Sequence, residues 1–140
     1  MPHKQLNILL VEDHPIQQLA EQELLASEGF TNVTSATKGA EAIELVKSQH
    51  FDLIILDLGL PDIDGYTVCE TIREFEVHRE LQSIIVALTA HSDLHYQQQS
   101  TIAGMDGFFV KPMTKQTINN ILNTYGLLFL NESMKMVIEG

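Results

Sequence analysis

The chain has 140 residues, a length that fits one compact domain. Nineteen acidic residues against eight Lys and Arg give a formal net charge of -11, which argues against autonomous binding of DNA or RNA. No apolar run approaches the roughly 20 residues that cross a bilayer, and residues 1–5 lack the apolar core of a secretory signal. The single Cys69 excludes an internal disulfide and a multi-cysteine zinc site. These features predict a small, acidic, cytoplasmic domain without a membrane partner.

Strand-like and helix-like segments alternate along the chain. The strand-like segments are short and apolar, as in sheets covered on both faces, and the others repeat apolar residues at helical spacing. In chain order, the predicted elements are a strand at 6–11, a helix through 16–24 with apolar Ile16, Leu19, Ala20 and Leu24, a strand at 33–36, a helix at 40–46, a strand at 53–56, a helix at 66–75, a strand at 83–88, a helix through 94–102, a strand at 108–110 and a helix through 114–122. This alternation predicts a parallel sheet with helices on both faces, joined by right-handed crossovers.

Polar residues follow four of the predicted strands. Glu12 and Asp13 come after the first strand, Asp57 after the third, Thr89 after the fourth and Lys111 after the fifth. In open α/β sheets, ligands bind at the carboxyl ends of the strands, near the point where the strand order reverses. We therefore expect three carboxylates, a hydroxyl and an ammonium group to converge at one edge of the sheet.

The expected cluster suits phosphoryl chemistry. Two carboxylates about 4 Å apart repel by about 4 kcal/mol at an effective dielectric constant of about 20, and a divalent cation relieves that repulsion. Ligands that are all oxygen favour Mg²⁺, which also binds phosphate oxygens. Lys111 would place a positive charge beside a phosphoryl oxygen, and Thr89 would supply a hydroxyl donor. Asp57 ends the most apolar strand, so we interpret it as the nucleophile that forms an acyl phosphate.

The order of several short motifs is specific when they are taken together. These motifs are Leu10-Val11-Glu12-Asp13, Leu56-Asp57, Pro61-Asp62-Ile63-Asp64-Gly65, Leu88-Thr89-Ala90 and Phe109-Val110-Lys111-Pro112. With them, the chain resembles the receiver domain of two-component response regulators from about residue 6 to residue 125. The resemblance implies a flavodoxin-like, doubly wound, five-stranded parallel sheet of order 2-1-3-4-5 with five helices. It places a receiver domain at 6–126 and leaves 127–140 as a C-terminal tail or linker remnant.

The resemblance also implies roles for the residues at the strand ends. Asp57 would accept a phosphoryl group from a phosphohistidine. Mg²⁺ would be bound by Asp57, by Asp13 directly, by Glu12 largely through water, and by the backbone carbonyl of Gly59. Lys111 would pair with Asp57 before the transfer and with the phosphoryl group after it. The chain would catalyse its own phosphorylation and dephosphorylation without being a stand-alone enzyme.

A conformational switch is a further implication of the resemblance. Thr89 would move towards the phosphoryl oxygens, and Phe108 would turn inward as the switch aromatic. The peptide bond between Lys111 and Pro112 is expected to be cis. Phosphorylation adds about 1.5 to 2 negative charges and three strong acceptors, which would bias two-state loops after the third and fourth strands.

The expected partners are a sensor histidine kinase, a histidine phosphotransfer domain, or both. By family resemblance, one rim would meet the helical hairpin that bears the donor histidine. The residues of this docking rim are Pro15, Gln17, Gln18, Glu21, Pro112 and Met113. The segment 92–104 contains Asp93 but neither Lys nor Arg, so charge pairs that would hold a dimer of fourth and fifth helices are missing. This absence predicts a monomer or a weak dimer.

Several alternatives stay open or are disfavoured. The receiver could be a single-domain regulator or part of a hybrid histidine kinase that relays phosphate to a histidine phosphotransfer protein, and the loop 58–65 favours the hybrid kinase.

An aspartyl-nucleophile phosphatase of the haloacid dehalogenase type needs an acid two residues after its nucleophile, where this chain has Gly59. A flavin module needs phosphate donors where Glu12 and Asp13 would repel phosphate. A metal-free pseudo-receiver would lack core residues, and none is lost.

Other polar residues receive structural interpretations. Asp62 and Asp64 are expected to form the turn after Asp57, and Cys69 to lie inert in the core. The four acids Glu70, Glu74, Glu76 and Glu80 are expected to form a solvated acidic face on and after the third helix.

Overall fold

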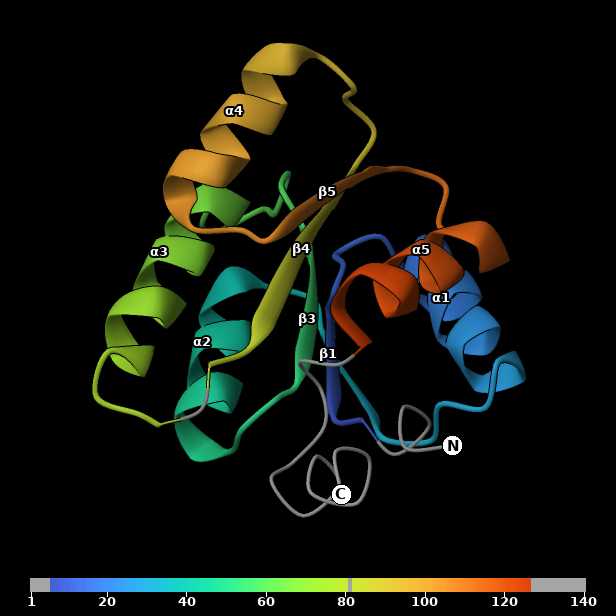
Figure 1. The fold of residues 1–140 in the computed structure, drawn as a ribbon, viewed down its shortest axis with the longest axis horizontal. Coiled ribbons are helices and arrows are strands. Elements are labelled where there is room, and N and C mark those ends of the chain that lie inside the picture. Colours follow the sequence, from blue (N-terminus) through green and yellow to red (C-terminus); the bar gives the residue numbers. More distant parts are fainter. Residues whose placement is uncertain (1–5, 81, 127–140) are drawn as a thin grey trace, which may run out of the picture.

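The computed structural model describes residues 6–80 and 82–126, in which five strands and five helices alternate (Figure 1). In chain order they are β1 Ile8–Val11, α1 Pro15–Ser27, β2 Val33–Ala36, α2 Gly39–Ser48, β3 Leu53–Asp57, α3 Gly65–Glu76, β4 Ile84–Thr89, α4 Leu94–Ala103, β5 Gly107–Val110 and α5 Lys115–Tyr125. The strands form one parallel sheet of order β2-β1-β3-β4-β5. This confirms the predicted flavodoxin-like fold. The predicted tail 127–140 lies outside the described residues.

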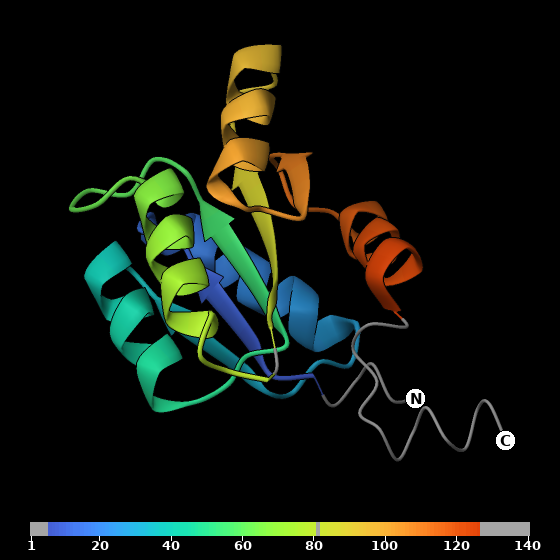
Figure 2. The ribbon, with the colours of Figure 1, turned by 60° about the vertical axis from the view of Figure 1, so that its left-hand side comes forward.

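The sheet lies between two layers of helices. Figures 1 and 2 show α1 and α5 on one face and α2, α3 and α4 on the other. Successive residues of β1 serve the two faces in turn: Ile8 and Leu10 pack in the cluster that contains Leu25 of α1, whereas Leu9 and Val11 pack in the other cluster. Burial on both faces explains why the strands are continuously apolar. No helix among the described residues is both long enough and apolar enough to span a membrane.

The loop after β3 is held in place by Asp62. Its carboxylate oxygens accept hydrogen bonds from the backbone N–H groups of Gly39 and Ala40, at 2.8 and 2.9 Å. These N–H groups belong to the first turn of α2, where helix geometry leaves them without partners within the helix. Asp62, predicted as a turn former, therefore also caps the neighbouring helix and fixes the loop that follows Asp57.

Gly65 is required by a close approach of backbone to backbone. A Cβ atom at this position would lie 2.7 Å from the carbonyl oxygen of Asp57 and 2.7 Å from Cα of Leu58. Asp64, the residue before it, accepts a hydrogen bond from the backbone N–H of Thr67 at 3.0 Å and caps α3. The segment Asp64–Gly65 thus starts α3 directly against the end of β3.

The apolar residues in the first half of α1 do not face the core as their helical spacing suggests. Ile16 is 75% exposed and Leu19 is 56% exposed, whereas Glu21 is only 6% exposed and Leu25 is buried. The first half of α1 lies beside the strand ends, where the Gln18 amide donates to the backbone carbonyls of Glu12 and Ala36. In this half of the helix the polar side chains of Gln18 and Glu21 are turned inward, and Ile16 and Leu19 are left exposed.

The predicted acidic face of α3 needs one correction. Glu70, Glu74 and Glu80 are exposed, but Glu76 is only 2% exposed. Its carboxylate accepts from Arg73, the residue three positions earlier, and from Ser83, which begins the approach to β4. Glu76 stands in the last turn of α3, so it points at the start of the neighbouring strand rather than at solvent. Cys69 is fully buried as predicted, and burial raises the pKa of its thiol to about 12.

Candidate functional site

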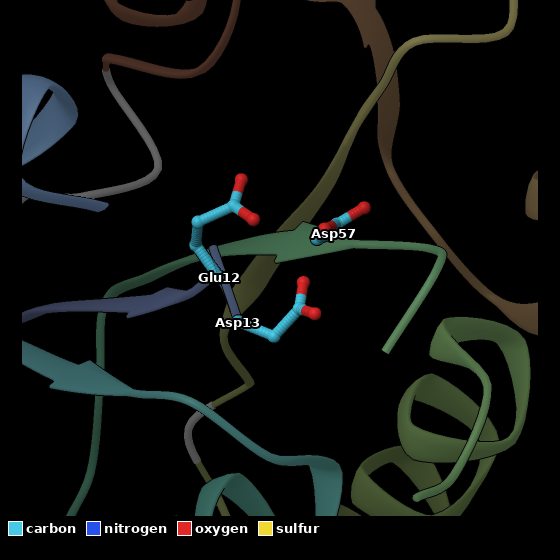
Figure 3. A group of neighbouring side chains, drawn as sticks. All are labelled: Glu12, Asp13 and Asp57. Atoms are coloured by element: carbon cyan, nitrogen blue, oxygen red, sulfur yellow. The ribbon is translucent and has the colours of Figure 1, made fainter. Parts of the chain in front are cut away.

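Three carboxylates meet at the carboxyl ends of β1 and β3. These strands pair with Val11 opposite Leu56, so the chain leaves them side by side at Glu12 and Asp57. One oxygen each from Glu12, Asp13 and Asp57 lies within 4.8 Å of the others. Figure 3 shows the three carboxyl groups projecting from these two strand ends into one space. The predicted convergence of the acidic residues is therefore confirmed.

Lys111 reaches this cluster from the end of β5. Its Nζ atom donates to Glu12 Oε1 at 2.6 Å, to Gln17 Oε1 at 2.7 Å and to Asp57 Oδ2 at 3.4 Å. The ammonium group lies nearer to Glu12 than to Asp57, the partner expected from the sequence. The three acceptors use all three N–H bonds of the ammonium. The peptide bond to Pro112 is cis, as expected.

Burial and the neighbouring charges shift the pKa values of both Glu12 and Lys111. Burial raises the pKa of Glu12, which is 1% exposed, and the Asp57 charge raises it further against the opposing hydrogen bond from Lys111. Burial by itself would lower the pKa of Lys111, but the bond to Glu12 and the charge of Asp57 outweigh it and raise that pKa. The site therefore holds Lys111 as a cation among partly desolvated acids.

The donor set fits magnesium. Glu12, Asp13 and Asp57 offer only carboxylate oxygens, with no sulfur or imidazole ligand in the group. Hard oxygen ligands of this kind suit Mg²⁺ rather than zinc or copper. Gly59, whose carbonyl was expected as another ligand, donates its N–H to Asp57 Oδ1 at 3.1 Å. That bond orients the Asp57 carboxylate, and the predicted role of the Gly59 carbonyl stays a prediction.

Asp13→Asn should separate charge repulsion from metal binding. We expect the free energy of unfolding in metal-free buffer to rise by about 1 kcal/mol, the energy of two like charges about 4 Å apart in water. The same change should weaken Mg²⁺ binding about tenfold, because one anionic ligand is lost. Urea unfolding with and without Mg²⁺ measures both effects. A variant that is less stable without metal would contradict the assignment of repulsion to this cluster.

The two predicted switch residues occupy neighbouring strands. Thr89 ends β4 and is buried, and its Oγ1 accepts a hydrogen bond from the backbone N–H of His91 at 3.2 Å. Phe108 lies on β5 opposite Ala87 and is half-buried against the core on the side of α3 and α4. The structure therefore places Thr89 beside the site and Phe108 on the adjacent strand, and the movement of either residue stays a prediction.

A stacked pair of rings links the loop after β4 to α4. The rings of His91 and Tyr96 lie 4.5 Å apart between centroids with an interplanar angle of 9°. Because the backbone of His91 also bonds to Thr89, these contacts run from the site to α4 without a break. Sequence reasoning missed this link. The only available signal was an aromatic residue five positions after His91, and that spacing is not specific.

The expected docking rim is divided by the structure into exposed and buried residues. Pro15, Gln17 and Pro112 are exposed, and Gln17 also accepts from Lys111. Gln18 is half-buried, and its amide is used within the fold. Glu21 and Met113 are buried side chains. The predicted rim is thus contiguous with the site, but only part of it projects into solvent.

Glu21 should make stability depend on pH. Burial and the charge of Glu12 raise the pKa of the Glu21 carboxyl from 4.5 to about 7, against the opposing charge of Lys111. An acid with a raised folded-state pKa costs stability as the pH rises from its unfolded pKa to its folded pKa, and the full cost persists above it. The shift corresponds to about 3 kcal/mol.

Glu21→Gln removes this ionisation and should therefore stabilise the fold at higher pH. We expect no advantage over the wild type from this cause at about pH 4.5 and a gain of up to about 3 kcal/mol at about pH 8. Urea denaturation at a series of pH values measures the difference between the two proteins. A difference that stays constant across this range would contradict the buried, ionisable state of Glu21.

Comparison with known proteins identifies the class. Residues 8–123 match the model of the family described as "Response regulator receiver domain". The chain belongs to this family and is a phosphoacceptor module of two-component signalling.

Two curated relatives carry this domain in different settings. The chain is 34% identical over 126 residues to the sensor protein GacS of Pseudomonas syringae pv. syringae, covering 89% of this chain and 14% of that protein. It is 30% identical over 117 residues to the DNA-binding transcriptional activator EvgA of Escherichia coli K12, covering 84% of this chain and 54% of that protein. The chain therefore spans only part of the length of these relatives.

Two solved structures are similar in fold and sequence. The receiver domain of the sensor histidine kinase PA1611 from Pseudomonas aeruginosa, with a magnesium ion in its active site cleft, has a TM-score of 0.76 and 33% identity, covering 86% of this chain and 97% of that one. The second is the co-crystal structure of the Saccharomyces cerevisiae histidine phosphotransfer protein Ypd1 with the receiver domain of Ssk1. It gives a TM-score of 0.80 and 27% identity, covering 91% of this chain and 94% of that one. Magnesium binding and complexes with histidine phosphotransfer proteins thus occur within the family.

Proposed function

We propose that Asp57 is the residue of this receiver that accepts the phosphoryl group, from a phosphohistidine on a partner domain. The observation that carries the proposal is the position of its carboxylate. Asp57 ends the central strand of the sheet, lies in the acidic cluster with Glu12 and Asp13, and has the Lys111 ammonium at 3.4 Å. Glu12 shares the cluster and the Lys111 ammonium, but among the acids of the described residues Asp57 alone also ends the central strand.

In the proposed transfer, a carboxylate oxygen of Asp57 attacks phosphorus. The new O–P bond forms as the P–N bond to the donor imidazole breaks, and the imidazole leaves with that electron pair. The N–H of Gly59 holds Oδ1 of Asp57, so the attacking oxygen is Oδ2, which accepts the 3.4 Å bond from Lys111. Mg²⁺, which Glu12, Asp13, Asp57 and the Gly59 carbonyl would hold, supplies positive charge that offsets the acids and the phosphoryl oxygens. Lys111 would exchange its bond to Asp57 for one to the phosphoryl group.

The proposed output uses the contacts after β4. A phosphoryl group on Asp57 offers acceptors that the Thr89 hydroxyl can bond, so its Oγ1 would leave the backbone N–H of His91. The loop that carries His91 would then shift relative to Tyr96 on α4, and Phe108 would turn inward. This extends the expected Thr89–Phe108 switch through the His91–Tyr96 stack.

The setting proposed for the module is a phosphorelay. A boundary at 6–126 and a tail or linker at 127–140 fit the family match to 8–123, and a cytoplasmic location fits partners that carry phosphohistidine. Similarity to GacS and PA1611 supports the receiver of a hybrid histidine kinase, whereas similarity to EvgA supports a separate regulator. In the first setting, the module itself has no kinase activity, and it passes phosphate to a histidine phosphotransfer protein.

Phosphoryl labelling of the purified chain tests this function. With acetyl phosphate and Mg²⁺, we expect one phosphoryl group per chain, stable to acid and labile to base as an acyl phosphate is. Chelation of Mg²⁺ with EDTA should remove the labelling, because the acids then repel the phosphodonor. Intact-mass spectrometry after acid or base treatment measures both results. A chain that stays unlabelled with Mg²⁺, or is labelled equally in EDTA, would contradict the proposal.

A further inference from the structure

A groove next to Lys111 is left unexplained by phosphoryl transfer alone. It has a volume of about 390 Å³ and lies between α1 and the connection from β5 to α5. Four of its lining residues are apolar, namely Ala20, Ala90, Pro112 and Met113, and two are charged, namely Glu21 and Lys111. Gln17 completes the lining, and both it and Lys111 are bonded within the site, so Glu21 is the charged group left to meet a ligand. A mainly apolar groove with an available acid suits a long cationic side chain.

Glu21 is an acceptor without a partner. The residue is 6% exposed, and its Oε1 atom is buried with no hydrogen bond among the described residues. Lys111, the cation that lines the same groove, uses its three N–H bonds on Glu12, Gln17 and Asp57. Buried acceptors are rarely left unsatisfied, so an unpaired carboxylate oxygen in the lining of a groove indicates a missing donor.

The charges around the groove favour a positively charged donor. Four carboxylates belong to this corner of the molecule, those of Glu12, Asp13, Glu21 and Asp57, whereas the Lys111 ammonium forms ion pairs with only two of them, Glu12 and Asp57. The chain as a whole carries a formal charge of -11. A cationic donor gains from this field, whereas a neutral donor gains only the hydrogen bond.

We propose that this groove binds the side chain of an arginine or lysine presented by the docking partner, with the alkyl stem against Ala20, Ala90 and Pro112 and the cationic head on Glu21. The proposal rests on the proposed function, since the partner is the phosphohistidine domain that must approach Asp57. Met113 lines the same groove, and its flexible side chain adapts to the stem that enters.

Binding of small fragments tests the groove without knowledge of the partner. The probe is n-butylguanidinium, and its control is n-butylurea, which has a similar shape but no charge. Saturating Mg²⁺ is present so that the guanidinium does not occupy the cluster of Glu12, Asp13 and Asp57. Amide shifts in ¹H–¹⁵N spectra should localise n-butylguanidinium at Ala20, Ala90 and Met113, with an affinity about tenfold above that of n-butylurea.

A matched pair of variants assigns the affinity to Glu21. Glu21→Gln should weaken n-butylguanidinium binding about tenfold, whereas Glu23→Gln, an exposed acid on the same helix, should leave it unchanged. The affinity of the wild type for n-butylguanidinium should also rise between about pH 6 and about pH 8, because Glu21 ionises over this range. The charged groups that face Glu21 are Glu12, Asp57 and Lys111. The Glu21→Gln variant should not show this rise. Equal affinity for both fragments, shifts confined to the acidic cluster, or an unchanged Glu21→Gln affinity would overturn the proposal.

Phosphotransfer separates the failure of this inference from the failure of the proposed function. The ratio of the labelling rate from a phosphohistidine domain to that from acetyl phosphate should fall about tenfold in Glu21→Gln and stay constant in Glu23→Gln. If acetyl phosphate never labels the wild type, the proposed function fails whatever the groove binds. If the wild type is labelled but n-butylguanidinium does not bind through Glu21, only the groove proposal fails.

Discussion

Asp57→Asn will abolish labelling of the chain by acetyl phosphate in the presence of Mg²⁺. The amide keeps the shape of the side chain and the position at the end of β3, but it lacks the anionic oxygen that attacks phosphorus. The variant also removes one of the three acids from the cluster, so its fold should remain intact. Intact-mass spectrometry, with base treatment to release acyl phosphate, measures the loss against the wild type.

Asp64→Asn is the matched control for this experiment. Asp64 is exposed and caps α3 seven residues after Asp57, and asparagine is an equally good cap. We expect this variant to be labelled as fully as the wild type. Full labelling of Asp57→Asn would place the acceptor at another residue and remove the basis of the proposed mechanism.

Arg73→Met will lower the free energy of unfolding by about 3–5 kcal/mol, the usual cost of breaking a buried charge pair from one side. Arg73 joins α3 to two other segments: it donates to the backbone carbonyl of Ser83 before β4, and to the carbonyl of Gly104 and the carboxylate of Asp106 (2.7 Å) before β5. Within α3 it donates to Glu76 at 2.8 Å. Glu76 is 2% exposed, so removal of the guanidinium leaves a carboxylate that water cannot solvate. Urea unfolding of both proteins measures the loss.

Arg79→Met is the control variant, because it makes the same chemical change at an arginine three residues after the end of α3. Arg79 donates one hydrogen bond to the carbonyl of Lys47 and lies over the ring of Phe75 at 4.1 Å. Such exposed contacts contribute about 1 kcal/mol or less. Losses of similar size in the two arginine variants would show that the Arg73 contacts add little to stability.

Several parts of the fold and the site were predictable because they follow from local patterns. Continuous apolar runs mark strands covered on both faces, and the carboxyl ends of parallel strands share one edge, so Glu12, Asp13 and Asp57 had to converge. The end of β5 brought Lys111 to the same edge. These inferences need only the order of the elements and the direction of the strands.

Other features could not be read from periodicity. The outward position of Ile16 and Leu19 and the burial of Glu21 depend on how α1 docks beside the ends of β1 and β2. The burial of Glu76 depends on Ser83 and Arg73 standing beside it. Helical spacing defines a face of the helix, but the neighbours that cover that face come from other elements.

The sequence by itself determined the alternation of strands and helices and the set of polar residues at the strand ends, because both depend on residues close together along the chain. Only the tertiary structure decided which charges pair: Lys111 lies closest to Glu12, 99 positions away, and farther from Asp57, 54 positions away. It also decided that Glu21 keeps a buried oxygen that receives no hydrogen bond within residues 6–80 and 82–126. Such pairings depend on side-chain reach and on burial from several elements at once, and no local pattern records either quantity.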